Sequence, residues 1–235
     1  ADLQVGSDAV MGDLIVAGDG FSLYIFSKDI PASADLAPGW ACQGGCLDAW
    51  PAYDAGESPV IDGLNAAAFD RYQRADGSYQ TTYLGWPLYR FANDQAAGDL
   101  NGEGNGGTWY AAVPKSYDLF MRNDAELGSF LATKDGFTLY VFANDTIGDA
   151  NSDPVSACEG GCLDTWPAFD LEGTRLPSTL DAADVTTFER PDGGTQAAYR
   201  GQPLYLFAND AAPGDTNGHG AGEGAWLVID PLASE

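Results

Sequence analysis

The sequence is poor in basic residues and in histidine. Its 235 residues contain 10 Lys and Arg against 35 Asp and Glu, of which 27 are Asp, and the formal net charge is -25. Nucleic acids and anionic membrane surfaces would repel such a chain. The acids are spread along the sequence, which favours a solvated acidic surface over a dedicated cation store. His219 is the one histidine, and the other half of the repeated sequence has none. A Ser-His-Asp or Cys-His catalytic site therefore could not be present in both halves.

Long apolar runs and an export leader are also missing from the sequence. No run approaches the roughly 18 apolar residues of a membrane span. The first ten residues, ADLQVGSDAV, have neither a basic region nor an apolar one, and we expect them to be the mature end of an exported protein. The sequence does not begin with a Cys, so we expect that any lipid anchor was either never present or lies outside this sequence.

The sequence instead contains a duplication within a duplication. A shift of 116 residues aligns Asp19 with Asp135 and Trp50 with Trp166, and a shift of 65 residues aligns Tyr24 with Tyr89. Two homologous halves, 1–115 and 116–235, are therefore expected to associate tightly. Each half holds two copies of a Tyr-x-Phe-x-x-Asp motif. The four copies are Tyr24, Phe26 and Asp29; Tyr89, Phe91 and Asp94; Tyr140, Phe142 and Asp145; and Tyr205, Phe207 and Asp210.

The local patterns predict an all-β fold built from antiparallel hairpins, with nearly six strands in each half. Asp-Gly turns at 19–20 and 135–136, and Gly-Trp-Pro or Gly-Gln-Pro turns at 85–87 and 201–203, join runs rich in β-branched and aromatic residues. Further strands are expected at 69–74, 79–84, 108–113, 186–190, 195–200 and 225–229. Short helical turns are candidates within LNAAAFD and STLDAADV. Barrel, sandwich and propeller arrangements stay open.

Alternation along a strand assigns a role to the motif residues. Tyr140 and Phe142 face one side of their strand, as do their counterparts, so the four aromatic pairs predict a core layer. The Asp follows the strand, where a carboxylate commonly accepts hydrogen bonds from loop N–H groups. We therefore expect Asp145 and its counterparts to fix turns.

The four cysteines form two C-x-G-G-C-L-D-x-W-P segments. Identical local spacing in the two halves predicts disulfides between Cys42 and Cys46 and between Cys158 and Cys162, which suits an oxidising compartment. Reduced thiols that hold a soft metal and a redox-active couple are the alternatives. Neither the C-x-x-C-H spacing of a c-type haem nor four close zinc ligands are present.

The motifs together resemble a family of bacterial secreted-repeat proteins, described as predicted lipoproteins with a Tyr-x-aromatic-x-x-Asp motif. The resemblance rests on the four motif copies, the C-x-x-x-C segments followed by Trp-Pro, and the segments GDLNGEGNGGTWYAAVP and GDTNGHGAGEGAWLVIDP, and it extends from about residue 12 to 231. It implies an exported bacterial protein, in the periplasm, outside the cell or at the cell envelope. It supplies no reaction.

Two Gly-Asp-x-Asn-Gly loops are candidate calcium sites. DLNGEG imitates the opening of a calcium loop, but Tyr110 stands where an EF-hand has its last Glu, and the second copy has His219 in place of an oxygen ligand. An EF-hand is excluded, and a looser oxygen site stays a candidate against Asx turns. Its candidate ligands are Asp94, Asp99, Asn101, Asp210, Asp215 and Asn217.

These patterns are compatible with three functions. A non-enzymatic, exported binding or structural module, whose partner would be an extracytoplasmic protein or a small ligand, is favoured because the repeated residues are aromatics, Gly, Pro and turn acids. A metal-binding or electron-transfer accessory protein that uses the C-x-x-x-C or the acidic loops is the alternative. An enzyme is not expected, because no nucleophile and base are arranged for catalysis, and no cofactor is assigned apart from the calcium candidate.

Overall fold

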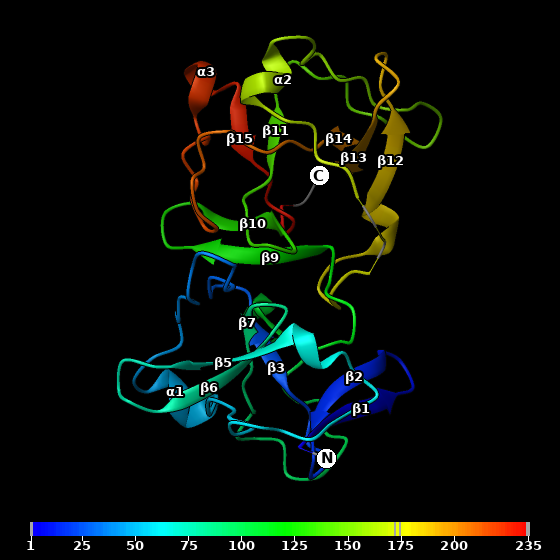
Figure 1. Cartoon of the computed structure of the whole chain (residues 1–235). Helices are drawn as coiled ribbons and strands as arrows, with labels where there is room; N and C mark the ends of the chain where they lie inside the picture. Colours follow the sequence, from blue (N-terminus) through cyan, green and yellow to red (C-terminus); the bar gives the residue numbers. More distant parts are fainter. Residues whose placement is uncertain (1, 172, 174, 234–235) are drawn as a thin grey trace. The chain divides into compact units, whose positions relative to one another are not determined.

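The computed structural model describes residues 2–171, 173 and 175–233, and the fold is all-β, as the sequence predicts (Figure 1). Small sheets predominate in this part of the chain, and all but one of the strand pairs are antiparallel. The helices there have three or four residues, and none of them is long and apolar enough to cross a membrane. The chain divides into two compact units, Ala1–Ser116 and Tyr117–Glu235.

The first unit contains three small sheets, with strand orders β2-β1-β4, β3-β8 and β5-β6-β7. Its elements are β1 (Leu3–Asp8), β2 (Gly12–Ala17), β3 (Tyr24–Phe26), α1 (Cys46–Ala49), β4 (Ile61–Asp62), η1 (Ala66–Ala68), β5 (Phe69–Gln73), β6 (Tyr79–Tyr83), β7 (Trp86–Pro87), η2 (Asn105–Gly107) and β8 (Trp109–Ala111).

The second unit has sheets β10-β9, β11-β15 and β12-β13-β14, which match those of the first unit except that no strand in its described residues corresponds to β4. Its elements are β9 (Leu119–Asp124), β10 (Gly128–Thr133), β11 (Tyr140–Phe142), α2 (Cys162–Thr165), η3 (Ala182–Asp184), β12 (Val185–Glu189), β13 (Thr195–Tyr199), β14 (Gln202–Pro203), α3 (Ala221–Gly224) and β15 (Trp226–Val228). The two candidate helical turns correspond to η1 and η3, whereas the turns α1 and α2 were not expected.

The Asp-Gly turns form, but the strands that follow them pair elsewhere. At the first turn the Ala17 N–H donates to the Phe21 carbonyl at 2.9 Å, and a single bridge joins Val16 to Ser22. The chain then leaves the hairpin, and β3 pairs along its length with β8, placing Tyr24 opposite Ala111. In the second unit β11 pairs with β15 in the same way. The expected pairing within these two hairpins is therefore mostly replaced by a long-range one.

The first hairpin of each unit was not expected from the sequence. In the first unit β1 pairs with β2 over six residues, and Oδ1 of Asp8 accepts hydrogen bonds from the N–H groups of Val10 and Met11 at 2.7 and 2.8 Å. Asp124 caps the turn between β9 and β10 in the same way. An Asp followed four residues later by Gly is the local signal that was missed.

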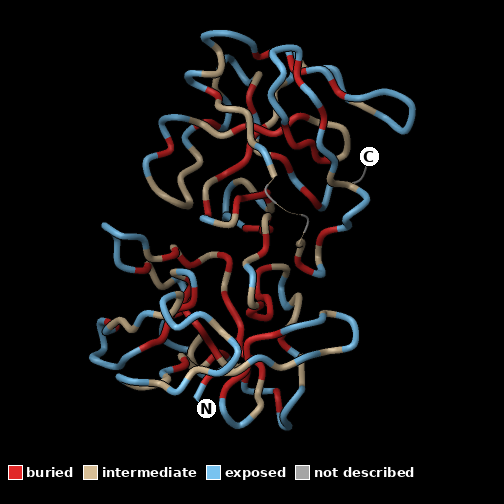
Figure 2. The backbone as a smooth tube through the Cα atoms, turned by 45° about the vertical axis from the view of Figure 1, so that its right-hand side comes forward, coloured by how far each residue is buried: buried red, intermediate tan, exposed pale blue. Residues whose placement is uncertain are grey.

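Alternation along the motif strands separates two cores in the second unit. Tyr140 and Tyr205 belong to an aromatic cluster with Trp166 and Trp226. Their neighbours Leu139 and Leu204, on the opposite face of the same segments, belong to an aliphatic cluster. Figure 2 shows the buried backbone running inside each unit, with exposed loops around it. The two motif segments of the second unit are therefore covered on both faces.

The hairpin between β6 and β7 depends on a glycine. Leu84 and Gly85 both have positive φ, 49° and 83°, as a type I′ turn requires. A Cβ at position 85 would lie 2.3 Å from the carbonyl oxygen of Ala32, whose N–H donates to the Gly85 carbonyl at 2.9 Å. The turn is therefore pressed against the loop that follows β3.

Substitution of Gly85 should test this close approach. Gly85→Ala should lower the free energy of unfolding by about 2 to 4 kcal/mol, because backbone strain and a clash with the Ala32 backbone add together. Gly77→Ala is the control, since Gly77 also has positive φ, 85°, but a Cβ there meets nothing within 4 Å; it should cost about 1 kcal/mol. Equal losses in urea denaturation would show that the contact with Ala32 contributes nothing.

Candidate functional site

The motif tyrosines and aspartates exchange hydrogen bonds between the two copies in each unit. The hydroxyl of Tyr24 donates to Oδ2 of Asp94 at 2.7 Å, and the hydroxyl of Tyr89 donates to Oδ2 of Asp29 at 2.7 Å. The second unit repeats the exchange. Tyr140 donates to Asp210 at 2.7 Å and Tyr205 to Asp145 at 2.8 Å. Each motif therefore supplies a donor to its partner motif and accepts one in return.

The backbones of the paired motifs are joined at the same residues. The N–H of Tyr24 donates to the carbonyl of Tyr89 at 2.9 Å, and the N–H of Tyr89 donates to the carbonyl of Tyr24 at 2.9 Å. Tyr140 and Tyr205 form the same reciprocal pair. All four tyrosines are fully buried. The two motifs of a unit thus cross at their tyrosines.

The other oxygen of each motif aspartate binds a loop. Oδ1 of Asp29 accepts from the N–H of Ala41 at 2.7 Å, and Oδ1 of Asp94 accepts from the N–H of Asn101 at 3.0 Å. Asp145 accepts from Ala157 at 2.7 Å, and Asp210 accepts from Asn217 at 3.0 Å. A single carboxylate therefore connects the buried crossing to the loop that precedes the C-x-x-x-C segment or to the Gly-rich loop.

Burial of these groups shifts their ionisation. Burial raises the pKa of Asp29 to about 7, although hydrogen bonds from Tyr89 and from loop N–H groups oppose the shift. Burial also raises the pKa of Asp145 and of Asp210. The pKa of Tyr205 rises to about 12, again mainly through burial, so this phenol stays protonated as the hydrogen-bond donor.

Four aromatic rings stack beside each crossing. In the first unit the order is Phe26, Trp109, Trp50 and Phe91, with centroid separations of 4.1, 3.8 and 4.2 Å. The planes of the two indoles are nearly parallel, with an interplanar angle of 1°. Tyr24 meets Trp50 edge-on at 5.5 Å. The second unit has the same stack from Phe142, Trp226, Trp166 and Phe207.

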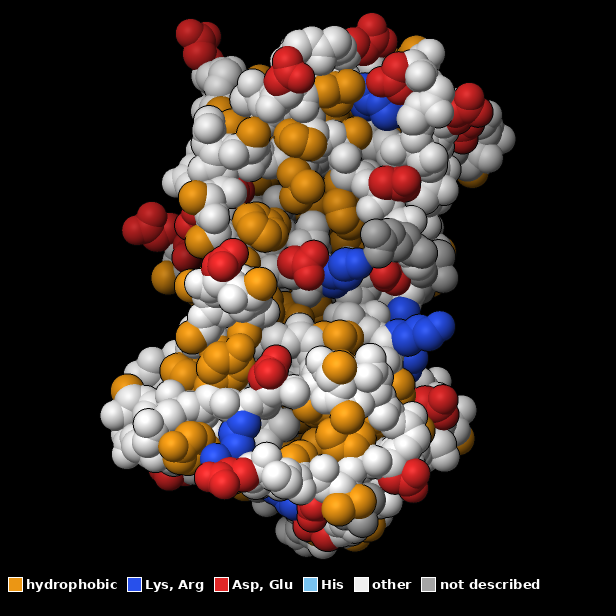
Figure 3. Space-filling view, viewed as in Figure 1, with side chains coloured by type: hydrophobic (Ala, Val, Ile, Leu, Met, Phe, Trp, Pro, Cys, Tyr) orange, Lys and Arg blue, Asp and Glu red, His pale blue; other side chains and the backbone are white. Residues whose placement is uncertain are grey.

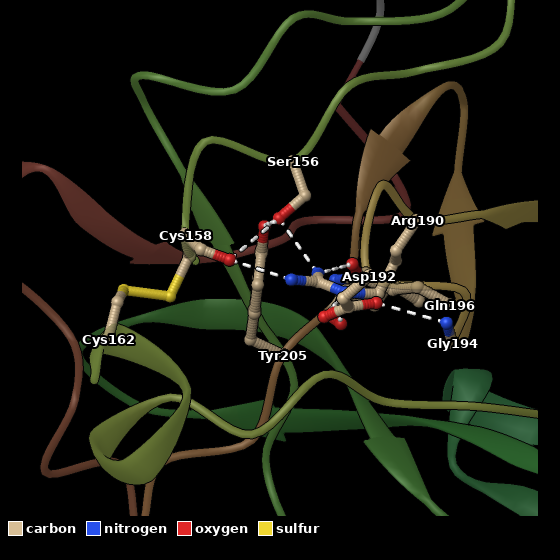
Figure 4. Close-up of polar contacts among 9 residues, drawn as sticks. Ser156, Cys158, Cys162, Arg190, Asp192, Gly194, Gln196 and Tyr205 are labelled. Carbon is tan, nitrogen blue, oxygen red and sulfur yellow. Dashed lines mark hydrogen bonds and ion pairs between the residues drawn. A yellow bond between two sulfur atoms is a disulfide. The ribbon is translucent and has the colours of Figure 1, made fainter. Parts of the chain in front are cut away.

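The cysteine segment is bonded to a buried arginine (Figure 4). Cys158 forms a disulfide with Cys162, and Cys42 with Cys46, as expected from the spacing. The guanidinium of Arg190 donates to the Cys158 carbonyl at 2.7 Å, to Oγ of Ser156 at 2.8 Å and to the side-chain carbonyl of Gln196. The hydroxyl of Tyr205 lies 2.7 Å from Oγ of Ser156. These hydrogen bonds connect the disulfide loop to the place where the two motifs cross, at Tyr140 and Tyr205.

The first unit has the same arrangement with one substitution. Arg74 donates to the Cys42 carbonyl at 2.7 Å and to Gln80. Trp40 replaces Ser156, and its ring lies 5.2 Å from Cζ of Arg74. These arginines and glutamines were not singled out from the sequence, although the shift of 116 residues aligns them.

The calcium candidates lie in loops that their own side chains close. Oδ2 of Asp99 accepts from the N–H groups of Gln95 and Ala96 at 2.8 and 3.0 Å, and Asp215 does the same with Ala211 and Ala212. In the described part of the chain, no three His, Cys, Asp or Glu side chains are grouped so that they could hold a metal ion. The calcium assignment stays a prediction.

Asp145 offers a test of the carboxylates. Asp145→Asn keeps an acceptor for the Ala157 N–H, and the Tyr205 hydroxyl can donate to Ser156, so the substitution should cost little. Asp145→Ala removes the acceptor and should lower the free energy of unfolding by about 1 to 3 kcal/mol, with or without calcium. Asp210→Asn is the matched variant. It should likewise cost little, because its side-chain oxygen still accepts from the Asn217 N–H and the Thr138 hydroxyl lies beside Tyr140. Equal losses for Asn and Ala at Asp145, seen only with calcium present, would instead identify a cation ligand.

Asp29 predicts a pH dependence of stability. Its folded pKa of about 7 lies above its ordinary value of 3.8, so the folded chain keeps a proton that the unfolded chain loses. The stability that this proton supplies is complete below about pH 3.8 and is lost as the pH rises through about 7. Asp29→Asn should therefore gain melting temperature relative to the wild type between pH 5 and 8. The exposed Asp35→Asn is the control. A difference between Asp29→Asn and the wild type that does not change with pH would contradict the shift.

Comparison with known proteins gives one match. The model of a family described as a secreted repeat of unknown function matches residues 71–113, 122–170 and 186–230, which together make up more than half of the chain. A search of curated proteins found no match, and a search of solved structures found none either. The matched segments contain three of the four motif copies and the second C-x-x-x-C segment. The chain belongs to this secreted-repeat family and is an exported protein.

Proposed function

We propose that this exported chain is a non-enzymatic binding or structural module. It works in the periplasm, at the cell envelope or outside the cell, and its partner is an extracytoplasmic protein or a small ligand. Two copies of one scaffold present their loops to that partner.

One observation carries the proposal: the repeated polar side chains bond to one another. The motif tyrosines donate to the motif aspartates, and Arg190 donates to a backbone carbonyl and to Gln196. A catalytic acid or base must reach its substrate, whereas these groups are mostly buried and bonded within their own unit. Because these repeated polar groups bond to one another within the fold, they support a structural role for the scaffold. Side chains that differ between the two units would then recognise the partner.

The surface charge is compatible with a soluble module that binds a cationic partner. Figure 3 shows acidic side chains scattered over the visible face, with few basic ones among them. With 35 acids against 10 bases, the field of the molecule keeps it soluble and attracts cationic partners.

The metal content of the protein distinguishes a non-enzymatic binding or structural module from a metal-binding or electron-transfer accessory protein. Protein secreted by a bacterial host and purified without added metal or chelator should contain less than about one tenth of an equivalent of copper or iron by elemental analysis, because the cysteines are joined in disulfides. Ser156→Ala, which leaves all cysteines and acids in place, is the control for handling. Copper or iron close to one equivalent per chain would replace the proposal with a metal-binding or electron-transfer accessory protein.

A further inference from the structure

The second unit has a hollow whose counterpart in the first unit is filled. The hollow is partly open to solvent, has a volume of about 220 Å³ and is lined by Phe137, Phe169 and Leu206. Asp118, Asp135 and Asp170 also line it. A space of this size and lining suits a single side chain or a small molecule with an apolar stem and a cationic head.

In the first unit an arginine of the chain itself occupies the corresponding place. Nη2 of Arg90 lies 2.8 Å from Oδ2 of Asp19. Cζ of Arg90 lies 5.6 Å from the centroid of the Phe21 ring and 5.3 Å from that of the Tyr53 ring. A guanidinium against two aromatic rings and a carboxylate combines cation–π attraction with a charge-assisted hydrogen bond.

The shift of 116 residues aligns the two places side chain by side chain. Asp135 corresponds to Asp19 and Phe137 to Phe21, so the acid and one ring are kept. Phe169 keeps the second ring but lacks the hydroxyl with which Tyr53 binds the carbonyl of Asp2 at 2.5 Å. Leu206 stands in the position of Arg90. The second unit thus retains the surroundings of a guanidinium and has lost the guanidinium.

We propose that the hollow of the second unit binds the guanidinium group of an arginine side chain or a similar ligand. The plane of the guanidinium packs against the rings of Phe137 and Phe169, and its N–H groups donate hydrogen bonds to the carboxylate of Asp135. The ligand supplies to the second unit the group that Arg90 supplies to the first. The inference rests on the proposed binding function and names its ligand class.

Lys134 provides a test of the charge in the hollow. It also lines the hollow, where the first unit has Gly18. The charged side chains that line the hollow are three carboxylates and the Lys134 ammonium, and one of the carboxylates, Asp118, already accepts a hydrogen bond from the Arg175 N–H at 2.8 Å. A planar guanidinium stacks on rings better than an ammonium does. Lys134→Gly copies the first unit and should tighten guanidinium binding several-fold.

Calorimetric titration of the full chain with N-acetyl-L-arginine amide at low salt tests the proposal. One equivalent should bind, the lysine analogue at least fivefold more weakly, and the uncharged citrulline analogue not measurably. Leu206→Arg should abolish binding, because the introduced side chain occupies the hollow as Arg90 does. Arg90→Leu should add a second site in the first unit, and this variant keeps the test decisive if Leu206→Arg does not fold.

A glycine-flanked arginine heptapeptide distinguishes the sources of the ligand. Binding at least tenfold tighter than that of the amide indicates an arginine of a protein partner, and equal binding indicates a free guanidinium compound; both support the inference. Three results would overturn it: no binding to the wild type, binding that Leu206→Arg does not change, or binding seen only in Lys134→Gly, which would make Lys134 the occupant. The metal analysis tests the scaffold function independently, so the two failures are distinguishable.

Discussion

The reciprocal exchange between tyrosine hydroxyls and aspartate carboxylates is the constraint on which each unit depends. A motif on its own would bury a phenol without an acceptor and leave a carboxylate without its donor, and each unpaired buried group costs about 1 to 3 kcal/mol. Two motifs crossed at their tyrosines satisfy both groups at once. The motif is therefore stable in pairs, which explains why the chain holds four copies arranged as two units.

Each crossing also fixes the elements around it. The second carboxylate oxygen holds the following loop, and the crossing tyrosines lie against the stacked indoles, so loop, strand and aromatic stack share the same few residues. The Phe-Trp-Trp-Phe stack then brings β8 against the segment that follows α1, because Trp109 begins β8 and Trp50 follows α1. A pair of aromatic rings is worth about 0.5 to 1.5 kcal/mol beyond its buried area, so three stacked contacts add a substantial part of a unit's stability.

The sequence predicts what is encoded locally and misses what depends on distant partners. The Asp-Gly turn at 19–20, the positive φ of Gly85 and strands such as β5 and β13 follow from neighbouring residues, and they are found where expected. The pairing of β3 with β8 does not follow from them, since the two strands are more than 80 residues apart. The shift of 65 residues shows that Tyr24 and Tyr89 are equivalent, but equivalence gives no sign that one donates to the aspartate of the other. The same limit applies to Arg190, whose partners Ser156 and Cys158 lie more than 30 residues before it in the sequence.

The differences between the units show which changes the scaffold tolerates. Glu103 accepts a hydrogen bond from the Ala111 N–H at 2.6 Å, and in the second unit Nδ1 of His219 accepts one from the Val228 N–H at 3.3 Å. The one histidine of the chain thus substitutes for a carboxylate as the acceptor at the strand that closes the unit, even though one residue has been inserted between His219 and Trp226. Where the scaffold needs an acceptor, one is kept in a different chemical form. At position 206 the second unit has Leu206 where the first unit has Arg90, so the scaffold folds with either an aliphatic side chain or a guanidinium at that place.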